Sequence, residues 1–381
     1  MSSYKKIPLG EVASYINGYA FKPIDWGKSG LPIIRIQNLT DENKEFNYYE
    51  GNFDKKYLIV KGDILISWSA SLGVYEWNKS DAILNQHIFK VVFDKIQIDK
   101  KYFFFALKKI LKEAIKNTHG STMKHITRPQ FEKILFPFYE LEKQKKIAKI
   151  LENISNIIEK KKQKLQKYDD LSKSIFIEMF GDLNFKHRVW ERKKFSELCQ
   201  INPTKNEIKE LEDNIEVSFI PMSAVSIDGI VNVAEKVKLK KVKTGFTFFK
   251  ENDVLFAKIT PCMENGKGGI VKNLKNGIGF GSTEFHVLRP LKNISTSYWL
   301  YYVTMLPQFR KNAENMMTGS GGQKRVPSSY FETLKINVPS IELQNQFAER
   351  IKIIEKSKIE IQKSIEETQK LFDSLMEKYF G

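Results

Sequence analysis

The chain has 381 residues, 41% of them hydrophobic, and a formal net charge of +17 at pH 7. This length and apolar content favour two globular domains over a disordered chain, and no run of about 18 apolar residues predicts a membrane span. Two cysteines without CxxC spacing argue against a disulfide framework or zinc site and favour the cytoplasm. The first residues, MSSYKKIPLGEV, lack the apolar stretch of a secretory signal. The charge favours a nucleic-acid partner, although a lysine-rich genome would produce the same balance.

Short apolar runs separated by turns fill residues 1–140. Runs such as LPIIRIQNL (31–39) and AILNQHIFKVVF (82–93) predict strands, and residues 100–116 predict a helix, so we expect an α+β domain. The domain ends in the loop NTHGSTMKHITRPQ (117–130), whose small and basic residues suit contacts to phosphates and bases, although an ordinary connector is the alternative. The candidate DNA contacts of this domain are Arg35, Gln37, Asn38, Trp68, Ser69, Lys124, His125 and Arg128.

Residues 141–181 predict one long helix. Helix-forming residues continue without Pro or Gly up to Gly181, so the helix has about 40 residues and a length on the order of 60 Å. Apolar side chains recur at alternating steps of three and four residues, the spacing of a coiled-coil seam. The predicted seam residues, for helix pairing and partner docking, are Leu151, Ile154, Ile158, Leu165 and Ile175.

Residues 182–340 show the same pattern of short apolar runs separated by turns as the first domain. They contain short predicted strands, then a predicted helix near 297–316 and the loop TGSGGQKRVPSSY (318–330), rich in Gly and Ser. We therefore expect a second α+β domain with a second DNA-contacting loop. The candidate DNA contacts here are Lys258, Thr260, Gln323, Lys324 and Arg325.

Residues 341–381 form a second copy of the long-helix segment. Residues 124–181 match residues 324–381 position by position without a gap, with identities such as Phe131/Phe331 and Gln144/Gln344. Neither helix could bury its apolar stripe alone, so we expect the two to pair antiparallel within one chain; a homodimeric coiled coil is the alternative. The seam residues of the second copy are Ile351, Ile354, Ile361, Ile365, Phe372 and Leu375.

A search for catalytic motifs finds none with the required spacing. The string INPTKN (201–206) lacks the second Pro and the aromatic residue that a base methyltransferase needs, and ENGKGG (264–269) lacks the Walker spacing. The five histidines form no HExxH. We therefore predict a non-catalytic chain without a cofactor or metal. The alternatives are an enzyme fused to a recognition module and a coiled-coil adaptor that binds only protein.

The duplicated pattern resembles the specificity (S) subunit of type I restriction–modification systems. The matching segments are HGSTMKHI, FEKILFPF and LEKQKKIAKIL in the first half, and GSGGQKRV, FETLKINVP and IELQNQFAERI in the second. The resemblance covers essentially the whole chain. One departure is that the first copy has Pro137 where the second has Pro339 two positions further on.

The resemblance implies an architecture and partners. Residues 1–140 and 182–340 would be target recognition domains with twisted sheets, each contacting one half of an asymmetric, bipartite double-stranded DNA target. Residues 141–181 and 341–381 would be antiparallel spacer helices that set the half-site distance and dock two methyltransferase subunits. Restriction subunits would complete the complex, and S-adenosylmethionine, ATP and magnesium would belong to the partner subunits. A type IIB-like assembly is the alternative within this class.

Overall fold

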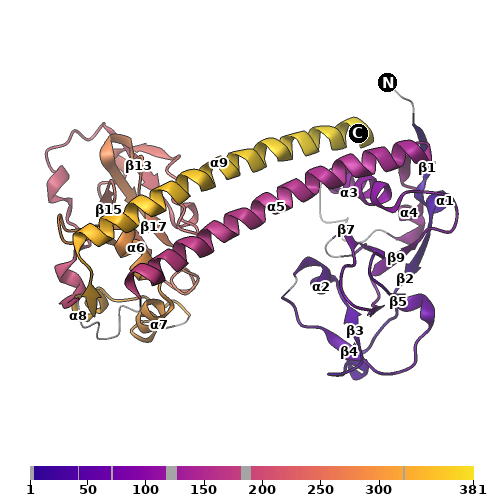
Figure 1. Ribbon diagram of the computed structural model, residues 1–381, viewed down its shortest axis with the longest axis horizontal. Coiled ribbons are helices and arrows are strands. Elements are labelled where there is room, and N and C mark those ends of the chain that lie inside the picture. Colours follow the sequence, from indigo (N-terminus) through magenta and orange to yellow (C-terminus); the bar gives the residue numbers. More distant parts are fainter. Residues whose placement is uncertain (1–3, 42, 70–71, 117–126, 182–189, 321) are drawn as a thin grey trace. The chain divides into compact units, whose positions relative to one another are not determined.

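The computed structural model describes the chain apart from residues 1–3, 42, 70–71, 117–126, 182–189 and 321 (Figure 1). The chain divides into two compact units. Unit 1 comprises Met1–Lys162 and Lys363–Gly381, and unit 2 comprises Gln163–Gln362. The division falls inside both long helices, because each half of a helix packs against the globular part of its own unit.

Unit 1 is built largely from strand pairs that are distant in sequence. The strand β1 (Lys5–Pro8) pairs with β10 (Leu135–Phe138) and so joins the start of the globular part to its end. The other sheets have the orders β2-β9-β6-β7 and β4-β3-β8-β5, with β3 and β8 parallel. Their strands are β2 (Ser14–Asn17), β3 (Leu31–Ile34), β4 (Asn47–Tyr49), β5 (Leu58–Ile59), β6 (Ile64–Ser67), β7 (Gly73–Glu76), β8 (Ala82–Leu84) and β9 (Ile88–Val92). The helices are α1 (Leu9–Val12), α2 (Ile36–Thr40), α3 (Lys100–Lys116) and α4 (Arg128–Glu132).

Unit 2 repeats this topology. The strand β11 (Glu191–Lys194) pairs with β20 (Lys335–Val338), and the other sheets have the orders β12-β19-β16-β17 and β14-β13-β18-β15, with β13 and β18 parallel. Their strands are β12 (Cys199–Ile201), β13 (Glu216–Ile220), β14 (Lys236–Lys238), β15 (Thr247–Lys250), β16 (Val254–Ala257), β17 (Gly268–Ile270), β18 (Ile278–Gly281) and β19 (Phe285–Pro290). Strands β1 to β10 therefore correspond in order to β11 to β20, which confirms the expected repeated α+β architecture.

The helix predicted at 100–116 is confirmed as α3. The single helix predicted near 297–316 is wrong, because the structure has two helices there with a break between them. The chain there forms α6 (Ser297–Met305) and α7 (Pro307–Asn315), and Leu306 between them is extended, with φ −60° and ψ 132°. Proline at 307 disfavours a helical conformation at the preceding residue and removes a backbone donor, so the helix has to break there. A further short helix, α8 (Ser329–Thr333), follows the loop.

The two long helices, α5 (Leu141–Phe180) and α9 (Ile341–Phe380), pack against each other in each unit. In unit 1 the first half of α5 lies beside the second half of α9, and Lys161 donates hydrogen bonds to Ser364 and Thr368. In unit 2 the second half of α5 lies beside the first half of α9, and Lys358 forms an ion pair with Asp169. The helices are therefore antiparallel partners within one chain, as predicted. Both lysines thus have polar partners on the other helix, which suits a role in setting the register.

The passage that occurs twice closes each unit. Phe131 and Phe331 are core residues, and the strands that follow them are β10 and β20, each paired with the first strand of its unit. Four residues into each long helix, Gln144 and Gln344 are completely buried. The Gln144 side chain accepts a hydrogen bond from the Asp99 amide at 3.0 Å, just before α3, and donates to a backbone carbonyl before α5. The repeated passage therefore forms a joint, that is, a hydrogen-bonded contact between the last strand of the unit, the start of its domain helix and the start of its long helix.

Gln344 makes the same joint in unit 2 and provides a test of it. Its side chain accepts from the Thr296 amide at 3.0 Å and donates to the carbonyls of Ile294 and Pro339 at 3.0 and 3.1 Å. We expect Gln344→Ala to lower the free energy of unfolding by about 1–3 kcal/mol, because these buried groups lose their partner. Gln346 is exposed on the same turn, so Gln346→Ala is the matched control and should be nearly neutral. Urea unfolding followed by circular dichroism measures both; equal losses would contradict the assignment.

Candidate nucleic-acid interface

Two groups of candidates distant in sequence meet on one surface of unit 2. The segment after β16 lies beside the end of the Gly-Ser loop, with Ile259 bridged antiparallel to Arg325. The amide of Thr260 donates to the carbonyl of Lys324 at 3.0 Å, and the Lys324 amide donates to the Thr260 hydroxyl at 3.1 Å. Lys258, Thr260, Lys324 and Arg325 therefore belong to one small, hydrogen-bonded surface, which we call the unit 2 basic surface.

Arg325 is held in a fixed orientation on this surface. Its Nη2 lies 2.7 Å from Oε1 of Glu284, and its Nε lies 3.1 and 3.0 Å from the two carboxylate oxygens. The hydrogen bond from Arg325 keeps the pKa of Glu284 below its usual range. The Arg325 side chain nevertheless remains 41% exposed. Nε and Nη2 of the guanidinium thus position it against Glu284, and Nη1 donates to the Gln323 carbonyl at 3.3 Å. The side chain still reaches solvent, where it is able to contact a base edge or a phosphate.

The lysines of this surface form no ion pair with a described residue, although Lys258 is near enough to Glu284 to contribute to lowering its pKa, after the larger effect of Arg325. Lys258 and Lys324 take part in no ion pair there, whereas Glu284 is engaged by Arg325. Lys258 also borders a cavity of about 290 Å³, which includes Thr204, Lys205 and Thr283. Unpaired ammonium groups beside hydroxyl donors favour an anionic ligand. Gln323 is exposed in the same loop, and its backbone carbonyl accepts from Arg325 at 3.3 Å.

Unit 1 places different side chains at the corresponding positions. Trp68 follows β6 as Lys258 follows β16, but its indole donates to Asn17 at 3.3 Å and its ring stacks on Phe89 with centroids 5.6 Å apart. Ser69 is buried, so it is not placed to contact DNA in this conformation. Arg128 is exposed on α4 and pairs with Glu132 at 2.7 Å. Lys124 and His125 lie outside the described residues.

The other three unit 1 candidates lie just after β3 and have unequal access to a ligand. Asn38 is 4% exposed, and its side-chain amide donates to the carbonyls of Lys44 and Glu45 at 3.0 and 3.1 Å. These bonds hold the 35–45 loop, so Asn38 has a structural role and is not free to contact a base. The Arg35 guanidinium lies over the Trp26 ring, 5.4 Å from its centroid. Gln37 is exposed.

The predicted seam residues lie between elements of their own units rather than on a free docking face. Leu151 belongs to the apolar core of unit 1, which Phe372 and Leu375 also contact, and Ile351 and Ile354 belong to that of unit 2. The remaining seam residues are buried or half-buried: Ile154, Ile158, Leu165, Ile175, Ile361 and Ile365. Sequence reasoning missed the exposed apolar side chains on the same helices, which are Ile150, Ile157, Leu171 and Ile177 on α5 and Ile353, Ile359 and Leu371 on α9.

A buried histidine behind the unit 2 basic surface was also not singled out from the sequence. His286 on β19 donates from Nε2 to the carbonyl of Val326 at 2.7 Å, and its Nδ1 lies 3.0 Å from Nδ2 of Asn202. This arrangement requires the neutral imidazole, because Nδ1 has to accept. Burial lowers the pKa of His286 to about 4, and nearby Lys258 acts in the same direction. His286 therefore supports the surface from beneath. Nothing in its sequence context distinguishes it from an exposed histidine.

Other kinds of site are absent among the described residues. In that part of the chain, no group of three or more His, Cys, Asp or Glu side chains could hold a metal ion. None of the described helices is long and apolar enough to cross a membrane.

Two copies of one α+β fold on a shared helix pair define a tandem-repeat protein, and comparison with known proteins identifies its family. The sequence matches the type I restriction modification DNA specificity domain over residues 1–167 and 188–370. The chain belongs to this family. The specificity subunit of the Escherichia coli type I restriction enzyme EcoAI is 38% identical over 193 residues, which are 49% of this chain and 32% of that protein. The MjaVIII specificity subunit of Methanocaldococcus jannaschii is 24% identical over 326 residues, 79% of this chain and 74% of that protein.

Solved structures show the same fold. The S subunit of a type I restriction–modification system from M. genitalium matches with a TM-score of 0.52 and 16% identity, over 100% of this chain and 96% of that chain. A chain from a structural study of type I R-M complex assembly matches with a TM-score of 0.57 and 12% identity, over 99% of this chain and 97% of that one. By contrast, the matches to the E. coli EcoAI and EcoEI subunits span only 32% and 25% of those proteins.

Proposed function

We propose that this chain is the sequence-specific DNA-recognition subunit of a type I restriction–modification complex and performs no catalysis itself. The observation that carries the proposal is the unit 2 basic surface, where Lys258, Lys324 and Arg325 converge from two segments distant in sequence. Family membership and the names of the relatives support it. Lysines that form no ion pair with a described residue suit phosphates, and a pre-oriented arginine suits bidentate contact with guanine.

Each unit would contact one half of a bipartite target, and the two halves would differ. The units share one topology, yet Trp68 stands where unit 2 has Lys258, and Phe89 stands where it has His286. A common scaffold with different side chains at matching positions favours different base sequences. An asymmetric target follows; a palindromic methylation motif in the cognate cell would contradict it.

We further propose that methyltransferase subunits bind along the long helices, which would set the half-site separation. The seam residues are used within the chain, so the docking contacts fall to exposed apolar side chains such as Ile150 and Ile157 in unit 1 and Ile353 in unit 2. The restriction subunits, S-adenosylmethionine, ATP and magnesium would belong to the rest of the complex, in the cytoplasm.

Replacing Arg325 by alanine tests the recognition proposal. We expect the affinity of the complex with its methyltransferase subunits for target DNA to fall by roughly 5- to 150-fold, with relaxed preference at one base pair. Lys324→Ala should weaken binding to all DNA sequences alike. Because one phosphate contact is lost, the slope of log affinity against log salt concentration should fall by about one. Fluorescence anisotropy at several salt concentrations separates the two effects. Arg350 is exposed on α9, so Arg350→Ala is the control. Unchanged binding in Arg325→Ala would remove that residue from the interface.

A further inference from the structure

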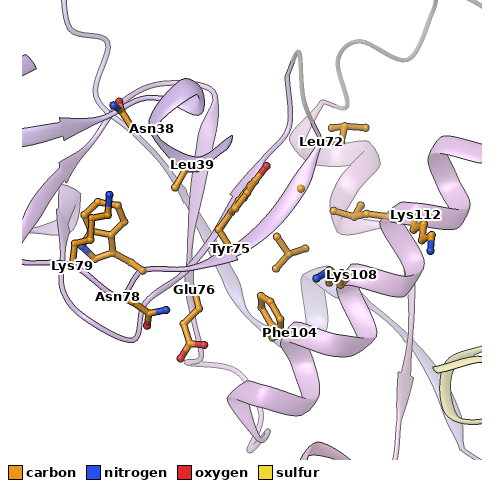
Figure 2. Close-up of a pocket in the computed structure, with 14 residues that line it drawn as sticks. Asn38, Leu39, Leu72, Tyr75, Glu76, Asn78, Lys79, Phe104, Lys108 and Lys112 are labelled. Atoms are coloured by element: carbon orange, nitrogen blue, oxygen red, sulfur yellow. The ribbon is translucent and has the colours of Figure 1, made fainter. Parts of the chain in front are cut away.

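Unit 1 contains a groove beside the edge strand β7. The groove has a volume of about 670 Å³ and runs between β7 and α3. Figure 2 shows Phe104, Lys108 and Lys112 of α3 on one side, with Tyr75 of β7 opposite. Because β7 is the last strand of the order β2-β9-β6-β7, no described strand covers its outer edge. A volume of this size suits a small ligand or a short peptide segment.

The repeated fold identifies the corresponding place in unit 2. The amides of Asp99 and Thr296, each just before its helix, donate to Gln144 and Gln344, so α3 and α6 begin at equivalent positions. Counted from these anchors, Phe104 corresponds to Tyr301 and Lys108 to Met305. The strand register gives the other wall, because Tyr75 pairs with Leu65 as Gly269 pairs with Leu255.

In unit 2 the chain itself fills this place. The segment between β13 and β14 passes over β17, so closely that a Cβ at Gly269 would lie 2.6 Å from the carbonyl oxygen of Gly229 and 2.7 Å from a methyl group of Val231. A Cβ at Gly229 would likewise lie 2.1 Å from the hydroxyl of Tyr301. The carboxylate of Asp228 is near enough to contribute to raising the pKa of Tyr301, for which burial is the larger cause. A tight turn that contains an acidic residue, closed by the hydrogen bond from the Ser226 amide to the Ile230 carbonyl at 2.9 Å, therefore occupies the space between edge strand and helix.

Unit 1 leaves the same space open in the part of the chain that the structure describes. The connection between β3 and β4 is shorter than its counterpart in unit 2 and forms α2, and Asn38 and Leu39 border the groove there. The ring of Tyr75 takes up some of the room that the absent side chain of Gly269 leaves in unit 2. The groove is the part of this space that neither Tyr75 nor the connection between β3 and β4 fills.

The groove combines apolar walls with exposed lysines, and the Glu76 carboxylate in its lining is already paired with Lys101. Leu72, Val74 and Leu111 supply apolar surface. Lys108 and Lys112 are exposed and take part in no ion pair with a described residue. The Lys108 ammonium lies over the Phe104 ring, 5.7 Å from its centroid, so an incoming carboxylate would pair with either lysine without displacing an acidic partner. Double-stranded DNA has no extended apolar segment to cover such walls, which favours a peptide.

We propose that this groove docks a turn-forming segment of a partner protein that carries an acidic residue between apolar ones, like residues 226–233 of this chain. The docking is a protein contact of unit 1 that goes beyond the proposed DNA recognition and does not depend on it.

The probe is a fluorescent peptide, SIDGIVNV, with the sequence of residues 226–233. We expect it to bind the full chain saturably, as measured by anisotropy. Lys108→Glu combined with Lys112→Glu should weaken binding by about tenfold, because two attractive charge contacts become repulsive. Lys55 and Lys61 are exposed elsewhere in unit 1, so reversing both is the control of equal charge, with a change within about twofold. A peptide with lysine in place of its aspartate should bind the variant that carries both Lys108→Glu and Lys112→Glu more tightly than it binds the wild-type chain.

Other outcomes would overturn the proposal. Absence of saturable binding, or equal losses in the double variant and its control, would show that the groove does not recognise such a segment. Displacement of the peptide by a short DNA duplex, with the same charge-reversal loss for the duplex, would assign the groove to nucleic acid. Thermal unfolding of each variant establishes that it is folded. The peptide with lysine in place of aspartate distinguishes lost charge contacts from damage to the site, because a damaged site would bind neither peptide.

Discussion

Replacing Ile354 by aspartate is expected to unfold unit 2 or lower its free energy of unfolding by about 4 kcal/mol or more. Ile354 is 7% exposed and belongs to the apolar core that includes Phe176, Phe347 and Ile351. The substitution removes a large apolar side chain and buries a carboxylate among apolar groups without a partner. Because both α5 and α9 contribute to this core, the variant also tests the pairing of the two helices.

The neighbouring residue provides the control. Ile353 is 68% exposed on the same turn of α9, so Ile353→Asp makes the identical chemical change on the outer face. We expect it to alter stability by no more than about 0.5 kcal/mol. Urea unfolding followed by circular dichroism compares the two variants. If Ile353→Asp cost as much as Ile354→Asp, the helix would be packed on a different face from the one described here.

Mild acid is expected to destabilise unit 2 through His286. In the unfolded chain this imidazole has its ordinary pKa of 6.5, whereas burial lowers it to about 4 in the folded state. Between these values the unfolded chain binds a proton that the folded chain does not, so stability falls as the pH drops from about 6.5 and levels off below about 4. The full difference corresponds to about 3 kcal/mol.

The variant His286→Phe isolates this contribution. Phe89 occupies the corresponding position in unit 1, where its ring lies 5.7 Å from Phe131, and the His286 ring lies 5.2 Å from Phe331. Phenylalanine is therefore compatible with the site but leaves the carbonyl of Val326 without its partner, at a cost of about 1–3 kcal/mol near pH 7. Denaturant unfolding at a series of pH values should show the wild-type and variant curves converging towards pH 4. Parallel curves would exclude His286 as the source of the acid sensitivity.

Much of the architecture followed from the sequence, because the repeat is long and free of gaps. Helix formers and heptad spacing predicted residues 141–180 and 341–380 as helices, and both are found there. The sequence showed that Gln144 matches Gln344, but not that each forms a hydrogen-bonded joint. The prediction failed at Leu306, where Pro307 ends a helix that apolar composition alone would have continued.

The candidate site was predicted only in part. The sequence suggested Lys258, Thr260, Lys324 and Arg325 as candidates, but nothing in it indicated that their two segments are bridged or that Glu284 holds Arg325. Asn38 has the residue type of a base contact, yet it is buried by a loop that uses its amide internally. Residue type shows what a side chain is able to do, and only its surroundings show whether it is free to do it.

The sequence by itself determined the duplicated plan and the long helices, since an α-helix forms its hydrogen bonds within four residues and its apolar stripe appears in any short window. Only the tertiary structure decided which strands pair, as when β3 aligns parallel to β8, and where unit 1 leaves open a groove that unit 2 fills. Those outcomes depend on contacts between residues far apart in the chain. Strand pairing, burial and ion pairs of this kind have no local pattern, because folding itself brings the partners together.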